Sequence, residues 1–120
     1  AACHALAPTA DATDWARIAA LYGQLLALTG SSVVALNRAV AIGMAAGPAA
    51  ALPLVDALAG DATLADYHLL PGVRGDLLAK LGRHAEAADA FEHAASLARN
   101  PRERDWLGAR ATACRARHND

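Results

Sequence analysis

Four side chains of the kinds that bind metal ions lie close together in the sequence, namely His84, Glu86, Asp89 and His93. Asp89 and His93 are four residues apart, a spacing that places two ligands on one face of a helix. A zinc site needs at least a third protein ligand, and the pattern supplies none that is evident. We therefore predict an exposed polar face here and no metal site.

A second polar cluster, formed by Asp66, Tyr67 and His68, contains groups that can transfer protons. The other interpretation is that this cluster caps a helix and bonds a neighbouring one. The sequence contains no glycine-rich phosphate loop and no nucleophile motif of the hydrolase type. We therefore expect no catalytic residue and no cofactor, and we predict that the chain is not an enzyme.

Asn37 and Arg38 lie in a segment that is otherwise apolar on nearly every side. A buried or half-buried charge needs a partner, and Asp76 is the expected partner of Arg38. In this interpretation the residues form a network between the second and fourth predicted helices. In the alternative interpretation, Asn37 lies on an inner face that holds a peptide. We predict that contacts with a partner come from Asn37, Arg38, Tyr67, His68, Arg74 and Asp76.

The C-terminal part of the chain is basic, because residues 99–117 contain six arginines and only two carboxylates. Arg102, Trp106 and Arg110 follow one another at a spacing of four, so an arginine can stack on the indole ring. Such a face can contact nucleic acid, an acidic protein surface or only solvent. We expect a solvated face, because the carboxylates interrupt the basic run.

Helices must position all of these side chains. The hydrophobic residues, 55% of the chain, are mostly Ala and Leu, and aromatic residues make up only 4%, a mixture that favours helix. No segment shows the alternation of a β-strand. The short connections require consecutive helices to be antiparallel. Apolar spacing and turn signals predict six helices, over residues 15–28, 33–44, 48–59, 70–81, 87–98 and 101–114.

Pro53 and Pro71 fall within the third and fourth of these helices. A proline removes a backbone hydrogen bond and costs about 3 kcal/mol in a regular helix interior. We therefore expect a kink at each position, or a fourth helix that begins at Pro71.

The segment around Gly82 resembles the centre of a tetratricopeptide repeat, in which two helices pack across a tight turn. Gly82 supplies the turn, Gly75 and Ala87 allow close approach of the helices, and Phe91 fills the space between them. A degenerate copy lies 35 residues earlier, where Gly47 takes the place of Gly82. We therefore predict an all-α fold of tandem antiparallel helix hairpins in a right-handed, tetratricopeptide-like superhelix.

The first sixty residues carry only five charged side chains. So few charges cannot cover the outside of an isolated half-domain, and we expect missing upstream helices, a second copy or a partner to shield it. No apolar run reaches the roughly 18 residues that span a membrane. Cys3 and Cys114 form no metal-binding motif, and we expect both to be reduced and packed. We predict a cytoplasmic chain without membrane contact, in which residues 1–120 form a single helical-repeat domain.

Several strings resemble the long C-terminal extension of a group of bacterial extracytoplasmic-function RNA polymerase sigma factors. The most specific is Leu36-Asn37-Arg38-Ala39-Val40-Ala41, and the others lie within residues 1–5, 14–22, 64–70 and 81–87. The chain departs from the pattern at Ser32, where proline is usual, and between Pro71 and Gly75, where histidine and alanines are usual.

This resemblance implies the regulatory tail of a transcription initiation factor, cut from a longer protein. Its partners would be proteins: the upstream domains of the same sigma factor, RNA polymerase or a regulator. DNA contacts would come only from the missing upstream domains. A free-standing adaptor with a tetratricopeptide-type fold and no role in transcription is the alternative, and the oligomeric state is open.

Overall fold

The computed structural model describes residues 14–119. Within this range the chain is all-α and contains no strand. A short 3-10 helix, η2 (Ala62–Leu64), lies between the third and fourth α-helices of this range. The α-helices are α2 (Trp15–Thr29), α3 (Ser32–Ala46), α4 (Pro48–Leu58), α5 (Leu69–Lys80), α6 (His84–Leu97) and α7 (Pro101–Asn119). The all-α prediction is therefore confirmed for the described residues.

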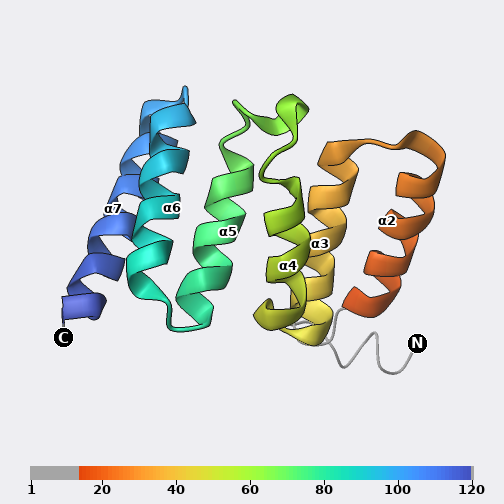
Figure 1. Cartoon of the computed structure of the whole chain (residues 1–120), viewed down its shortest axis with the longest axis horizontal. Helices are drawn as coiled ribbons and strands as arrows, with labels where there is room; N and C mark the ends of the chain where they lie inside the picture. The colour runs from red at the N-terminus through yellow and green to blue at the C-terminus, as the bar shows by residue number, and fades with distance from the viewer. Residues whose placement is uncertain (1–13, 120) are drawn as a thin grey trace, which may run out of the picture.

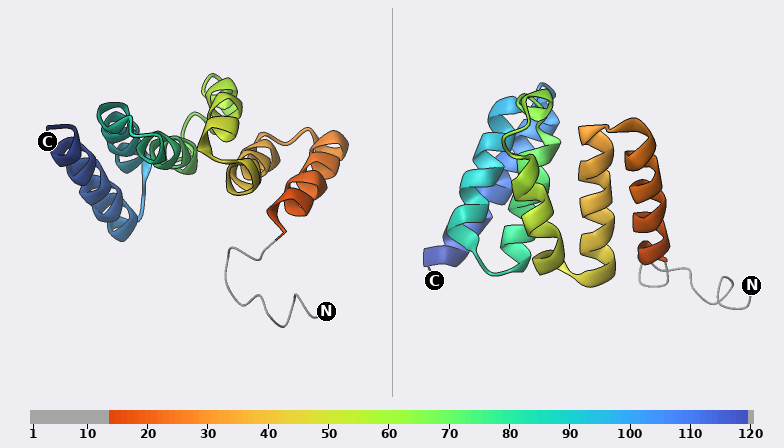
Figure 2. Two further views of the ribbon diagram at one scale, coloured as in Figure 1. Left: turned by 90° about the horizontal axis from the view of Figure 1, so that it is seen from below. Right: turned by 45° about the vertical axis from the view of Figure 1, so that its right-hand side comes forward.

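The helices follow one another across the molecule in chain order, and each packs against the next (Figure 1). The chain runs along one helix in one direction and returns along its neighbour, so that α2 and α7 lie at opposite ends (Figures 1 and 2). Helix α3 also contacts α5, although α4 separates them in the sequence. The molecule measures 45 × 34 × 26 Å along its principal axes.

Local capping explains where α2 begins and ends and where α3 begins. The Asp14 side chain accepts a hydrogen bond from the Arg17 N–H at 3.0 Å, and the Ser31 hydroxyl accepts one from the Val34 N–H at 3.3 Å. These bonds satisfy N–H groups that have no partner within the helix. Gly30 ends α2 with φ of 63°, a left-handed conformation that glycine adopts without strain.

The two prolines affect their helices differently. Pro71 lies in the first turn of α5, where a helix does not need the missing N–H, and the helix begins two residues before it. Pro53 lies inside α4, and the helix continues through it to Leu58. The proline leaves the Ala49 carbonyl without its usual donor, and Ala49 is exposed, so water can replace that donor. The expectation that α5 begins at Pro71 is therefore wrong by two residues.

The tightest helix contact is between α5 and α6. A Cβ atom added to Gly75 would lie 2.9 Å from Cδ1 of Phe91, closer than side chains normally approach. Phe91 itself is 1% exposed, and Ala87 and Ala94 on the same helix are fully buried. Gly82 turns the chain between the two helices with φ of 80°. The predicted close approach around Gly75 and Phe91 is therefore confirmed.

Helix α2, at one end of the molecule, is packed much less tightly than α5 and α6. Helix α2 has no buried residue, and Leu21, Leu25 and Leu28 are 53%, 42% and 85% exposed. In contrast, Leu107, Ala111 and Cys114 anchor α7 in the core. Cys114 is a free, buried thiol, whereas Cys3 lies outside the described residues. No helix within residues 14–119 is both long and apolar enough to cross a membrane.

Candidate partner-binding groove

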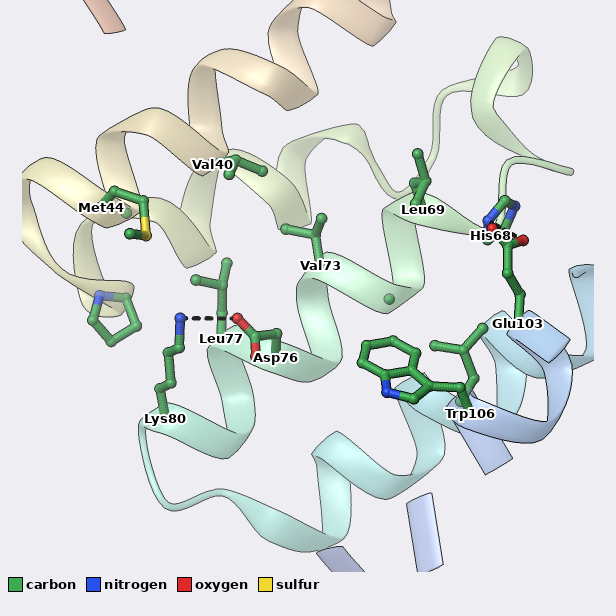
Figure 3. A pocket seen from close by; sticks show the side chains of 14 residues that line it. Val40, Met44, His68, Leu69, Val73, Asp76, Leu77, Lys80, Glu103 and Trp106 are labelled. Carbon is green, nitrogen blue, oxygen red and sulfur yellow. Dashed lines mark ion pairs between the residues drawn. The ribbon is translucent and has the colours of Figure 1, made fainter. Parts of the chain in front are cut away.

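A groove of about 390 Å³ crosses one face of the molecule and is bounded by α3, α5 and α7. Figure 3 shows Val40 and Met44 of α3 on one side and Trp106 and Glu103 of α7 on the other. Side chains of α5 lie between these two sides. The lining therefore comes from every second helix of the chain, with only Pro48 added from the start of α4.

Large apolar side chains in this groove are open to solvent. Met44 is 46% exposed and Trp106 is 58% exposed, and Val40 and Leu69 are exposed beside them. Beneath them, Leu77 and Leu107 belong to the buried core. Clustered exposed apolar side chains at the rim of a groove mark interaction surfaces in soluble proteins. The groove therefore offers a ready-made surface for apolar groups of another molecule.

A charged network lies at one end of the groove. Asp76 of α5 accepts from Lys80 at 3.0 Å, one turn along the same helix, and from Arg110 of α7 at 3.3 Å. The guanidinium of Arg110 also lies over two aromatic rings, 4.7 Å from the centre of Phe91 and 5.3 Å from that of Trp106. The predicted stacking of arginine on Trp106 is confirmed for Arg110. These contacts hold Arg110 and Trp106 in fixed positions at the groove.

At the other end of the groove, His68 contacts helix α7. Nε2 of His68, the residue before α5, lies 3.0 Å from Oε2 of Glu103 on α7. The Tyr67 ring meets the His68 ring edge to face, with 6.1 Å between centroids, and Tyr67 packs against the core. This cluster thus bonds a neighbouring helix, as the structural interpretation of its sequence proposed. The capping part of that interpretation is wrong, because the N-cap residue His68 forms no side-chain capping hydrogen bond with α5.

The six side chains predicted to contact a partner are not in one place. His68 and Asp76 line the groove. Asn37 is exposed on α3, one turn from Val40, but does not line the groove. Tyr67 is half-buried against the core and does not line the groove either. Arg74 donates to Asp56 of α4 at 2.8 Å and lines a separate hollow.

The expected ion pair between Arg38 and Asp76 is not formed. The carboxylate of Asp76 is taken by Lys80 and Arg110, and Arg38 lies towards α2, where Nε would be 3.5 Å from a Cβ at Gly23. Lysine four residues along the same helix is a near neighbour by geometry alone, whereas Arg38 is on another helix. The network between α3 and α5 predicted from Arg38 is therefore wrong.

The groove residues that sequence reasoning missed are mainly apolar: Val40, Met44, Val73 and Trp106. A signal for them exists in the sequence. Positions 33, 37, 40 and 44 form one stripe along α3, and positions 69, 73, 76 and 80 form one along α5. Four of the eight are Val40, Met44, Val73 and Leu69, all of which line the groove. A comparison of the two stripes could have found Val40, Met44 and Val73, whereas Trp106 lies on another helix.

Two of the four residues considered for metal binding, Glu86 and Asp89, have other partners. Glu86 accepts two hydrogen bonds from Arg83, at 2.9 and 2.7 Å, and these bonds lower the pKa of the Glu86 carboxyl. Asp89 accepts from Arg115 at 2.9 Å. Among residues 14–119 no group of three or more His, Cys, Asp or Glu side chains could hold a metal ion.

Comparison with known proteins finds a bacterial relative whose name states no function. The chain is 46% identical over 107 residues to an uncharacterized protein of Rhizobium meliloti (strain 1021). The match covers 89% of this chain and 25% of that protein, so the chain spans about a quarter of its relative's length. No family model matches the chain, and no solved structure matches it.

Proposed function

We propose that the chain is the C-terminal regulatory domain of an extracytoplasmic-function sigma factor, which acts in transcription initiation by binding protein. Its helix pairs form tetratricopeptide-like hairpins in a right-handed superhelix, and the inner helices α3, α5 and α7 hold a polypeptide segment. The partner is the upstream part of the same protein, RNA polymerase or a regulator. The setting is the cytoplasm, and DNA is contacted only by the upstream domains.

The observation that carries this proposal is the open groove lined by α3, α5 and α7 (Figure 3). In a row of helix pairs the first helix of each pair faces the inside of the curve, and stacked inner helices make a continuous binding surface. The lining consists of apolar groups and of side chains already held in ion pairs. Such a surface provides contact area and specificity for a polypeptide. A catalytic site would instead bring an acid, a base and a nucleophile within reach of one substrate atom.

The resemblance to the sigma factor extension supports the transcriptional part of the proposal. Its most specific string, residues 36–41, lies in α3 and includes Val40 of the groove. Buried Leu36, Ala39 and Ala41 of the same string pack α3 into the molecule. The string therefore combines the residues that fix the helix with one that lines the proposed binding surface.

The test is transcription in a purified system. The full-length protein that contains this chain is expected to direct core RNA polymerase to specific promoters, and Trp106→Ala is expected to change the amount of transcript. Arg104→Gln on the same helix is the control, because Arg104 is exposed and lines no pocket described above.

A full-length protein that gives core polymerase no promoter specificity would contradict the role in transcription. If that protein still binds a polypeptide through Trp106, the free-standing adaptor is the correct interpretation. If Trp106→Ala and Arg104→Gln change transcript levels equally, the groove is not the regulatory surface.

A further inference from the structure

A second hollow, distinct from the one that Arg74 lines, has a volume of about 490 Å³ and adjoins the groove at its charged end. It lies between the turn that joins α5 to α6 and the C-terminal half of α7, and Asp76 and Lys80 line both spaces. Figure 3 shows these two side chains on α5, linked by their ion pair, at the edge of the groove. The groove and the hollow are therefore neighbouring parts of one surface, separated by this ion pair.

The second hollow is basic. Lys80, Arg110 and Arg117 line it, and Asp76 is the only carboxylate among its lining residues. Asp76 pairs with Lys80 and Arg110, whereas Arg117 has no ion pair with any residue that the structure describes. Three cations thus line a hollow with a single carboxylate, which leaves an excess of positive charge for an incoming anion. Asp76 also restrains two of the cations and so reduces the entropy lost when they bind that anion.

His84 also lines this hollow. It lies at the start of α6, directly after the turn, and its Nδ1 atom is buried without a hydrogen-bond partner within the described part of the chain. Buried nitrogen atoms are normally hydrogen-bonded, since an unpaired one loses its interaction with water. His84 Nδ1 is therefore an unsatisfied polar atom of a residue that lines the hollow.

We infer that the groove and the basic hollow bind one polypeptide segment whose apolar residues are followed by a cluster of acidic ones. The apolar residues lie against Met44, Val73 and Trp106, and the acidic residues lie beside Lys80, Arg110 and Arg117. This inference rests on the proposed function and names the chemistry of its partner. Complementary charge at one end of an apolar contact fixes the direction of the bound segment and selects among partners.

The far end of the groove favours the same direction. Glu103 lies there, paired with His68, so an acidic residue would meet a carboxylate instead of free cations. Nucleic acid fits this surface poorly, because it needs cations along its whole phosphate backbone and the groove between the two ends is apolar. A small ligand is usually enclosed on most sides, whereas this groove runs open across three helices (Figure 3).

The experiment is a selection of random peptides displayed on phage, using the 120-residue chain as bait. Enriched peptides are expected to combine apolar residues with an acidic cluster on one side. One such peptide is then synthesised with a fluorophore, together with a version in which Asn and Gln replace Asp and Glu. By fluorescence anisotropy the neutral version is expected to bind about tenfold more weakly, and salt is expected to weaken only the acidic version.

Matched variants assign this preference to the hollow. Arg117→Gln is expected to remove most of the difference between the acidic and neutral peptides while leaving the circular dichroism and thermal unfolding of the chain unchanged. Arg104→Gln, which removes the same charge from the same helix, is expected to keep the difference.

The inference is overturned if no peptide is enriched, if enriched peptides are basic or lack acidic residues, or if Arg117→Gln and Arg104→Gln behave alike. Its failure is distinguishable from failure of the proposed function. If the full-length protein binds acidic peptides selectively but cannot direct polymerase to promoters, only the sigma factor proposal is contradicted. A transcriptional effect of Trp106→Ala without any preference for acidic peptides ends only this inference.

Discussion

Asp61 is held at the start of η2 by hydrogen bonds from two neighbours. One oxygen accepts from the hydroxyl of Ser32, at the start of α3, and the other accepts from the N–H and the hydroxyl of Thr63 at 2.9 and 2.6 Å. The bond from Ser32 is the largest of the causes that lower the pKa of Asp61 below its ordinary value of 3.8. A single residue thus ties the loop before α5 to α3, and so helps to position one wall of the groove.

Ser32→Ala is expected to lower the melting temperature near neutral pH, where Asp61 is charged. Because the native state holds the proton less firmly than the unfolded chain does, this contribution is present above the ordinary pKa. It is lost as the pH falls through the lowered pKa of the folded state. The melting temperatures of variant and parent should therefore converge in acid. Ser96→Ala is the control, since the Ser96 hydroxyl donates to the His93 carbonyl and not to a carboxylate. A Ser32→Ala effect that is the same in acid as at neutral pH would contradict this account.

At the scale of elements, the contact between α5 and α6 shows how a small residue sets the distance between helices. Gly75 is buried against the ring of Phe91, and no room remains for a methyl group. Gly108 on α7 has open space where its Cβ would be. The same substitution at these two helical glycines therefore separates packing from helix propensity.

Gly75→Ala is expected to destabilise the chain by about 1 to 2 kcal/mol, because overpacking of about 1 to 3 kcal/mol exceeds the gain of up to about 1 kcal/mol in helix propensity. Gly108→Ala is expected to have the opposite effect and to stabilise by up to about 1 kcal/mol. Urea unfolding followed by circular dichroism measures both. Equal effects of the two substitutions would show that Phe91 does not constrain α5.

The positions of the helices could be predicted from the sequence because their signals are local. Apolar spacing, the Ser31 cap and the turn at Gly82 each act within a few residues, and the contact of Gly75 with Phe91 belongs to one compact motif. Pairs between helices could not be predicted in the same way. Lys80 is near Asp76 by helix geometry alone, whereas the choice between Arg38 and Arg110 depends on how the helices are arranged.

At the scale of the whole molecule, the apolar surface is unevenly distributed. Leu21, Leu25 and Leu28 of α2 are exposed at one end, and the groove side chains Met44 and Trp106 are exposed on the face shared by α3, α5 and α7. The sequence predicts that the charge-poor first sixty residues need cover, and the exposed side chains of α2 and of Met44 lie in that part of the chain. It could not place the groove, because whether Trp106 is buried or exposed depends on which helices lie beside α7. Trp106 and Leu107 are neighbouring apolar residues of α7. Leu107, Ala111 and Cys114 are buried in the core, whereas Trp106 is exposed.

The two tryptophans of the chain lie in different places and report on this surface directly. Trp106 lines the groove, whereas Trp15 begins α2, which contributes no side chain to it. The decisive measurement is a nuclear magnetic resonance titration of the isotope-labelled chain with the peptide selected above, following both indole N–H signals. We predict that the Trp106 signal shifts with saturation and the Trp15 signal stays in place. A shift of Trp15 alone, or no shift of Trp106 at saturating peptide, would contradict binding in the groove.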